Sequence, residues 1–269
     1  MLSSVRAWIA LQCRIGRELR KFNSLSILLK IYALNAIGRQ KVVPVYLFGR
    51  RLHVRTATPD LYVATETLGS EFDALSDLPF SDSSLFIIDA GGYIGTASIA
   101  LKSLFPDSVI VCLEPSSENF ALLKRNTEGI KSIHPINAAL VNEGMPNELY
   151  LAESSTGPWG FEVIETASAT TEPIQTTTVA KIMQDFEVSR VHICKMDIEG
   201  GEYALLQNPE VWLDCVDALA IELHERKRSG IELLFRRATA ARLNLRLPGE
   251  KILSLSHEYL SGLLLGGKR

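Results

Sequence analysis

The sequence lacks the features of a disulfide-stabilised, zinc-bound or membrane-spanning protein. Its four cysteines form no Cys-x-x-Cys pair and show no zinc-like spacing, so we expect neither disulfides nor structural zinc. One apolar stretch, Leu25 to Ile37, is interrupted by Lys30 and falls short of the roughly 20 apolar residues that a membrane helix needs. The first residues show no pattern of a secretory signal peptide. These absences predict a cytoplasmic protein without a transmembrane segment.

What is present is the composition of an ordinary globular protein. The chain has 269 residues, of which 46% are hydrophobic and 22% charged, and this balance excludes a disordered chain. The length suits one α/β domain with a short extension, or two domains at most. A net charge of −3 gives no general attraction to nucleic acid, so we expect no nucleic-acid partner.

The charge is unevenly distributed along the chain. Residues 1–41 contain eight basic side chains and a single acid, Glu18. Apolar residues recur in this region at helical spacing, which predicts one or two amphipathic helices: Trp8, Leu11, Ile15, Leu19 and Phe22. The pattern favours a helical cap whose bases lie in water. Peripheral contact of the basic N-terminus with a membrane or an anionic partner stays open as the alternative.

The periodicity of the apolar residues divides the chain into three parts. Residues 1–41 form the helical extension, 42–80 predict a hairpin and a helix, and 81–269 predict the main domain. In the main domain, short apolar runs alternate with helical segments, which is typical of a doubly wound, mainly parallel sheet covered on both faces. The expected strands are 85–88, 109–113, 133–136, 191–196 and 218–223, and 252–255 is expected to close one edge. A helix is predicted over 231–243, and hairpins and turns between 140 and 178.

The loop after the first strand of such a sheet is where ligands bind, and here it spans Asp89 to Gly95. A dinucleotide-binding fingerprint needs glycines at i, i+2 and i+5, but counting from Gly91 those positions hold Tyr93 and Thr96. No Gly-Lys-Ser/Thr follows, so a P-loop is also excluded. The acid at the strand end would repel a pyrophosphate and suits a positively charged ligand such as an aminoacyl sulfonium.

The second strand ends in Glu114, a position from which a carboxylate can accept hydrogen bonds from both hydroxyls of a ribose. Either feature alone has a simpler explanation, namely a turn without a ligand or an exposed acid at a strand end. The glycine loop and Glu114 together are much more specific than either one.

The stretch from Leu85 to Glu225, about half of the chain, resembles the FkbM-type methyltransferases. The matching segments are Ile88–Gly91, Ile94–Ala97, Leu113–Pro115 with Glu118–Phe120, Trp159–Phe161, Lys195–Glu202 and Ile221–His224. The resemblance implies a Rossmann-like methyltransferase fold with a seven-stranded sheet and S-adenosylmethionine as the cofactor. It also implies methyl transfer to a hydroxyl of a sugar or a polyketide-like metabolite. Tyr93 departs from the family, which often has asparagine there.

The resemblance further implies a set of cofactor-binding residues. Asp89, Gly91 and Gly95 would frame the methionine part, Glu114 the ribose, and Asn137 with Ala138 would lie near the adenine. The complete expected set is Asp89, Gly91, Gly92, Tyr93, Gly95, Glu114, Asn137, Ala138 and Asp197.

Methyl transfer to a neutral hydroxyl needs a base as the new bond forms. His224 is the first candidate for the catalytic base because a histidine pKa suits proton removal near neutrality, although a structural histidine is the alternative. Asp197, at the end of the fourth strand, is the second expected catalytic residue. Asp197, Glu199 and Glu202 crowd a helix start, where acids are favoured by the helix dipole, so we predict no metal.

The sequence leaves the identity of the acceptor open. An aromatic loop, Trp159–Phe161, could stack on a sugar ring or simply pack as a small apolar cluster. Methylation of nitrogen or of a protein side chain, or a noncatalytic module that keeps the fold, would produce the same cofactor loop.

Overall fold

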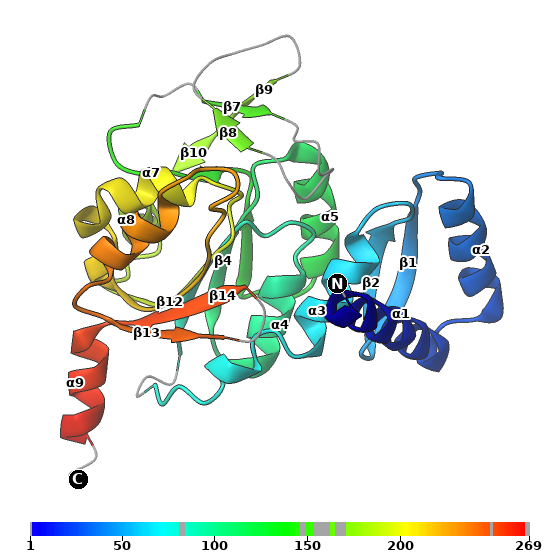
Figure 1. Cartoon of the computed structure of the whole chain (residues 1–269), viewed down its shortest axis with the longest axis horizontal. Helices are drawn as coiled ribbons and strands as arrows, with labels where there is room; N and C mark the ends of the chain where they lie inside the picture. Colours follow the sequence, from blue (N-terminus) through cyan, green and yellow to red (C-terminus); the bar gives the residue numbers. More distant parts are fainter. Residues whose placement is uncertain are drawn as a thin grey trace.

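A seven-stranded sheet forms the centre of the computed structural model (Figure 1), which describes residues 2–80, 84–145, 149–152, 162–164, 171–247 and 250–266. The strand order is β13-β14-β12-β11-β3-β4-β5. The strands are β3 (Phe86–Ala90), β4 (Val109–Leu113), β5 (Ile133–Ile136), β11 (Val191–Met196), β12 (Val216–Glu222), β13 (Leu243–Arg246) and β14 (Lys251–Leu255). Within this sheet, the two strand pairs that involve β14 are antiparallel and the other four are parallel. The predicted mainly parallel, seven-stranded sheet is confirmed.

The expectation that residues 252–255 close an edge of the sheet is wrong. Strand β14 lies between β12 and β13, so it is paired on both sides and most of its side chains are buried. The edge strand is β13, which sequence reasoning placed at the end of a helix and beyond it. The helix α8 (Ile231–Ala238) ends earlier than predicted. Strand β13 was missed because all its side chains are exposed, so it carries no buried alternation for a pattern to detect.

Helices cover both faces of the sheet, and β3 shows how its side chains alternate between them. Ile87 faces a cluster that includes residues of α4 (Thr96–Leu104) and α5 (Ser117–Thr127). Phe86 and Ile88 face the opposite cluster, which includes residues of α6 (Val179–Asp185), α7 (Glu202–Gln207) and α8. Because β3 is buried on both faces, the carboxyl end of the strand and its loop are held from both sides.

The chain contains further elements besides the sheet and its covering helices. The short 3₁₀ helices are η1 (Asp73–Leu75), η2 (Pro209–Val211) and η3 (Leu213–Cys215), and the last α-helix is α9 (His257–Gly266). The segment predicted as hairpins forms two small sheets, one of β6 (Ala139–Leu140) with β10 (Thr176–Thr177), the other of β7 (Leu149–Ala152), β8 (Glu162–Ile164) and β9 (Glu172–Ile174). The aromatic segment Trp159–Phe161 lies outside the described residues.

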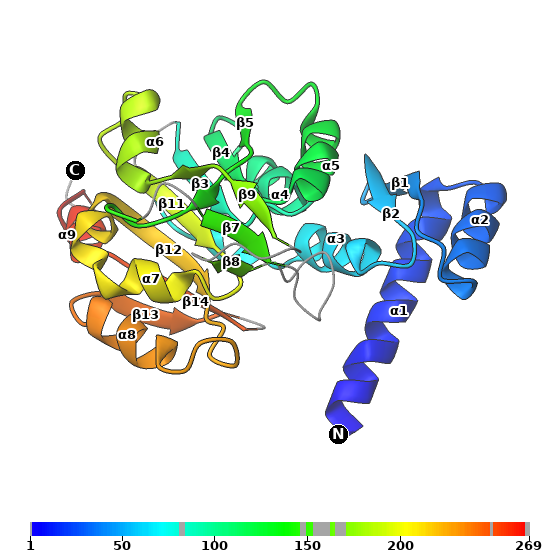
Figure 2. The same cartoon turned by 90° about the horizontal axis from the view of Figure 1, so that it is seen from above.

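The N-terminal part lies at one side of the sheet, next to α5 (Figure 2). It comprises α1 (Leu2–Phe22), α2 (Leu25–Ala36), the antiparallel hairpin of β1 (Val42–Leu47) and β2 (Arg50–Arg55), and then α3 (Asp60–Gly69). The buried apolar side chains of the hairpin join the same cluster as α4 and α5. No helix in the described part of the chain is long and apolar enough to cross a membrane. The division at residues 41 and 80 stays a prediction.

A buried ion pair joins the hairpin to the main domain. Arg55 at the end of β2 contacts both carboxylate oxygens of Asp60, with Nε 3.0 Å from Oδ2. The same guanidinium donates to Glu118 of α5 at 2.9 Å. The hydroxyl of Tyr93, in the glycine loop, hydrogen-bonds to Asp60. The loop is therefore tied to the N-terminal part through Asp60.

Replacing Asp60 by alanine should lower the free energy of unfolding by about 3–5 kcal/mol, because it leaves the buried Arg55 charge without its main partner. Urea unfolding monitored by circular dichroism measures this loss. The matched control is Glu118→Gln, which removes the other partner of Arg55. The Glu118 side chain is 60% exposed, so the loss there should stay below about 1 kcal/mol. Equal losses in the two variants would contradict this account of the junction.

Candidate active site

A cavity of about 660 Å³ opens at the carboxyl ends of β3, β4, β11 and β12. This is the position expected for a ligand in an open, mainly parallel sheet, and the volume suits a small organic ligand. One side is formed by the glycine loop and the end of β4, including Gly91, Gly92, Tyr93, Glu114 and Ala138. A second part of the lining, the α3 side, is formed by α3 and the residues after it, the end of β12 and the residues around the start of β14, including Tyr62, Glu66, Glu71, Glu222 and Lys251.

Close contacts with neighbouring residues require glycine at two positions of the loop. The N–H groups of Gly91 and Gly92 both donate to the carbonyl of Leu113, which folds the loop onto the end of β4. A Cβ on Gly91 would lie 1.8 Å from the carbonyl oxygen of Asp197, and the residue has a positive φ of 80°. A Cβ on Gly92 would lie 2.3 Å from Sγ of Cys112. The loop can occupy this place only without side chains at both positions.

Tyr93 adopts a left-handed conformation, with φ of 51°, which explains why asparagine suits this position. In this chain the tyrosine ring is instead anchored by its hydrogen bond to the buried Asp60. The backbone N–H of Tyr93 donates to Oε2 of Glu114 at 2.8 Å. The departure from asparagine is therefore accommodated by the buried network of Arg55 and Asp60.

Glu114 lines the cavity at the end of β4, and its carboxylate is held by three donors. These are the N–H of Tyr93, the N–H of Ser116 at 3.0 Å and the side-chain amide of Asn119 at 3.3 Å. Burial raises the pKa of Glu114 to about 7, although these hydrogen bonds oppose the rise. The carboxylate thus faces the cavity in a fixed orientation, with a protonation state that changes near neutral pH.

Asp89, one of the residues expected to frame the cofactor, does not itself line the cavity. Its side chain is fully buried and accepts a hydrogen bond from Ser98 at 2.7 Å. Its other oxygen lies 3.3 Å from Nζ of Lys195, which in turn donates to the carbonyl of Gly91 at 2.7 Å. Burial disfavours the charge on Lys195, but the carboxylates of Asp89 and Asp197 outweigh it and raise the pKa of the lysine. Asp89 therefore acts on the loop through Lys195.

Of the two residues expected near an adenine, one lines the cavity and the other supports its wall from behind. Ala138 lines the cavity, whereas Asn137 does not. The side-chain amide of Asn137 donates to the carbonyls of Glu114 and Pro115, at 2.8 and 3.0 Å. Asn137 therefore fixes the backbone that carries Glu114.

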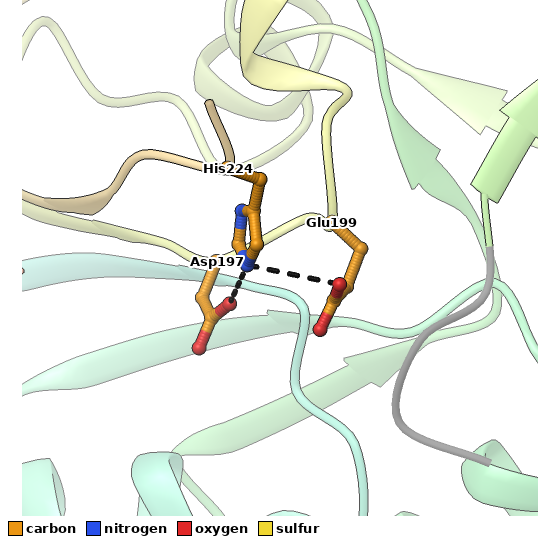
Figure 3. A group of neighbouring side chains, drawn as sticks. All are labelled: Asp197, Glu199 and His224. Atoms are coloured by element: carbon orange, nitrogen blue, oxygen red, sulfur yellow. Dashed lines mark ion pairs between the residues drawn. The ribbon is translucent and has the colours of Figure 1, made fainter. Parts of the chain in front are cut away.

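Four carboxylates surround His224, which follows β12 (Figure 3 shows two of them). Nδ1 lies 3.0 Å from Glu202, and Nε2 lies 3.6, 3.7 and 3.8 Å from Asp197, Glu199 and Glu222. Burial alone would lower the pKa of His224, but the carboxylates raise it to about 9. We expected the pKa of His224 to lie near neutrality, but this raised pKa keeps the imidazole protonated at neutral pH. His224 is also absent from the cavity wall, whereas three of its carboxylate neighbours line it.

Lys251 is the feature that sequence reasoning missed. Its Nζ lies 2.7 Å from Glu71, 2.9 Å from Glu222 and 3.5 Å from Asp197. Burial opposes ionisation of Asp197, but Lys195, Lys251 and His224 together lower its pKa. Burial and repulsion by Asp197 raise the pKa of Glu222. A lysine at the start of a strand, far from any motif, carries no signal of this role in the sequence.

Asp197, Glu199 and His224 could also hold a divalent cation, because each offers a ligand atom within 4.8 Å of the others. When His224 is protonated, its imidazolium already forms ion pairs with Asp197 and Glu199. Lys227 also pairs with Glu199, at 2.7 Å. A cation would have to displace the imidazole proton. The expectation that no metal binds stays a prediction.

Comparison with known proteins assigns the activity. A model of the FkbM methyltransferase domain matches residues 89–243. Methyltransferase 1 of Beauveria bassiana is 28% identical over 171 residues, covering 55% of this chain and 68% of that protein. Two solved structures resemble the fold with low TM-scores. They are TrmK of M. capricolum with S-adenosylhomocysteine (8% identity, TM-score 0.38, 70% of this chain, 67% of that chain) and the delta-N METTL16 methyltransferase domain (10%, 0.43, 86% and 94%).

The sheet, the glycine loop and these matches define the class of protein, which is an S-adenosylmethionine-dependent methyltransferase with a Rossmann-like fold. Because the family model covers more than half of the chain, the chain belongs to the FkbM methyltransferase family. The identification rests on the family model, since the solved structures are too distant to carry it.

The cavity fits this cofactor. Gly91 and Gly92 leave a space that side chains would fill, and Glu114 presents a buried carboxylate of the kind that binds ribose hydroxyls. Carboxylates outnumber lysines around the cavity, which suits a ligand with a sulfonium charge. The glycine loop and Glu114 would hold the nucleoside and methionine parts of the cofactor.

Replacing Gly91 by alanine should weaken binding of S-adenosylhomocysteine by at least about tenfold, because the loop must move away from Asp197 to admit the methyl group. Isothermal titration calorimetry measures the affinity. Gly129→Ala is the matched control, because Gly129 has a similar φ of 84° and nothing within 4 Å of an added Cβ. The control should lose about 1–2 kcal/mol of stability from backbone strain and keep its affinity. Similar affinities in the two variants would show that the close contact is not needed.

Proposed function

We propose that this enzyme methylates a hydroxyl group of an uncharged, hydroxyl-rich small molecule, such as a sugar or a secondary metabolite. The observation that carries the proposal is the polar, acidic lining of the cavity on the α3 side. Four glutamates lie there, with hydroxyl-bearing side chains between them: Glu66, Glu71, Glu222 and Glu250, with Tyr62, Thr67 and Ser70. Carboxylates accept hydrogen bonds from hydroxyls and repel anionic acceptors such as carboxylic acids or phosphates.

Asp197 is the proton acceptor in this proposal. Bound S-adenosylmethionine would supply a methyl group on a positively charged sulfur, and S-adenosylhomocysteine would be the leaving group when the acceptor oxygen takes the methyl. Asp197 lines the cavity between the glycine loop and the α3 side, and its lowered pKa keeps it ionised at neutral pH. An ionised carboxylate next to the reacting hydroxyl can take its proton as the carbon–oxygen bond forms. Asp197 thus has the role that we first expected of His224.

His224 and Lys251 position the carboxylates of the site. The imidazolium of His224 contacts Asp197, Glu199, Glu202 and Glu222 from behind the cavity wall. Lys251 contacts Asp197 and Glu222 from β14. Without these cations, neighbouring carboxylates would repel one another and at least one would take up a proton.

Methylation of nitrogen is the second candidate, because an acidic lining also attracts an ammonium group.

A methyl-transfer screen with labelled S-adenosylmethionine separates methylation of oxygen from methylation of nitrogen. Its acceptors are neutral sugars, hydroxylated metabolites, primary amines and the corresponding sugar acids. The proposal predicts alkali-stable methyl ethers from neutral hydroxylated acceptors and little product from sugar acids. Transfer to amines alone would replace the proposal with the second candidate, and preferred transfer to sugar acids would contradict both.

The pH profile of kcat/KM distinguishes Asp197 from His224 as the base, because it reports the protonation of the free enzyme. With Asp197 as the base, kcat/KM should not rise as His224 loses its proton near pH 9, because the imidazolium supports the ionised Asp197. A change of kcat/KM between pH 6 and 8 should follow the titration of Glu114, whose pKa is about 7. A base with a pKa of about 9 would instead make kcat/KM rise about tenfold for each pH unit up to that value. Initial rates at limiting acceptor concentration between pH 6 and 10 provide the test.

The variants Asp197→Asn and His224→Gln sharpen this result. Asp197→Asn should lower kcat by about 10²- to 10⁴-fold, the range of a positioned base. Asp185→Asn is the control, since Asp185 is an exposed helix residue paired only with Lys181 in the described structure. A tenfold rise per pH unit in the wild type that His224→Gln abolishes would restore His224 as the base.

A further inference from the structure

Helix α2 is apolar on two opposite sides, although only one of them packs against the protein. The packed side joins the core cluster through Ile27, Leu28, Ile31 and Leu34. On the other side, Leu25, Leu29 and Tyr32 are 71%, 59% and 75% exposed. Their spacing of four and three residues places them along one stripe of the helix. A short helix that is apolar nearly all round is normally buried, so this one lacks a covering layer.

Two further large apolar side chains next to α2 in the chain are also exposed. Phe22, the last residue of α1, is 53% exposed, and Ile37, directly after α2, is 70% exposed. We call Phe22, Leu25, Leu29, Tyr32 and Ile37 the α2 stripe. Helix α2 lies at the outer edge of the molecule, on the side away from the central sheet (Figures 1 and 2). Single exposed apolar residues need no explanation, but several large ones on and beside one helix mark a contact surface.

The chain before, within and after α2 is rich in basic residues. Exposed bases precede, interrupt and follow α2, and no ion pair involves them among the residues that the structure describes: Arg17, Arg20, Lys30, Arg39 and Lys41. Glu18, the only acid within residues 1–41, is already paired with Lys21 at 2.6 Å. The surface therefore combines an apolar row with uncompensated positive charge.

We propose that the α2 stripe docks onto a lipid bilayer that carries anionic headgroups. Such a surface offers an apolar layer for the stripe and negative charge for the flanking bases. A second copy of the chain fits less well. Symmetric pairing of the stripe would bring Lys30 and its basic neighbours of two copies together, and like charges at an interface oppose association. The inference is independent of the acceptor proposed above.

Cosedimentation of the full chain with vesicles tests the docking. The vesicles contain phosphatidylcholine with about one third phosphatidylserine, or phosphatidylcholine alone, at low and high salt. We expect binding to the anionic vesicles, at least about tenfold weaker binding to the neutral ones, and release by high salt. A chain that stays in the supernatant with anionic vesicles, or binds both vesicles equally, overturns the proposal.

The triple variant Leu25→Ser, Leu29→Ser, Tyr32→Ser should lose vesicle binding by at least about tenfold, with circular dichroism and methyl transfer in solution unchanged. Lys30→Gln combined with Arg39→Gln and Lys41→Gln should lose only the binding that depends on anionic lipid. Leu233→Ser is the control, because Leu233 is similarly exposed (54%) but lies on α8. If light scattering shows a wild-type dimer that the triple variant dissociates, while vesicles do not bind, the stripe covers a second copy and the proposal fails.

Discussion

The active site depends on one close backbone contact, the approach of Gly91 to the carbonyl of Asp197. Strands β3 and β11 are neighbours, with Ala90 opposite Met196 and the N–H of Asp197 bonded to the carbonyl of Ala90. The loop that follows β3 and the carboxylate that follows β11 therefore begin from the same point of the sheet. Lys195 strengthens the link by donating to the carbonyl of Gly91. A side chain at position 91 would collide with the carbonyl of Asp197 and force the glycine loop and Asp197 apart.

A surplus of carboxylates determines the chemistry of the cavity built on this contact. Lys195, Lys251 and the imidazolium of His224 keep Asp197 ionised but do not balance all the acids around it. The uncompensated charge suits a sulfonium and a neutral acceptor, and disfavours an anionic one. The same surplus raises the pKa of His224 to about 9, which favours the imidazolium form at neutral pH. Protonation states here follow from the whole cluster, and no single side chain determines them.

The sequence predicted the features that depend on local pattern. Buried strands, the glycine loop and the place of Glu114 at a strand end follow from apolar runs and from the rule that parallel strands present their carboxyl ends together. Features that depend on distant partners could not be predicted. The edge strand β13 has no buried alternation, Lys251 reaches Asp197 only because β14 inserts beside β12, and Asp89 is buried by its neighbours. The protonation of His224 required the positions of carboxylates that lie up to 27 residues away in the chain.

The central claim is that the cofactor occupies the side of the cavity formed by the glycine loop and Glu114, and leaves the α3 side to the acceptor. A crystal structure of the enzyme with S-adenosylhomocysteine tests it most directly. The account predicts ribose hydroxyls within hydrogen-bond distance of Glu114, the adenine beside Ala138 and the sulfur directed toward Asp197. A nucleoside bound instead among Tyr62, Glu66 and Glu71, with Glu114 free of ligand, would contradict it.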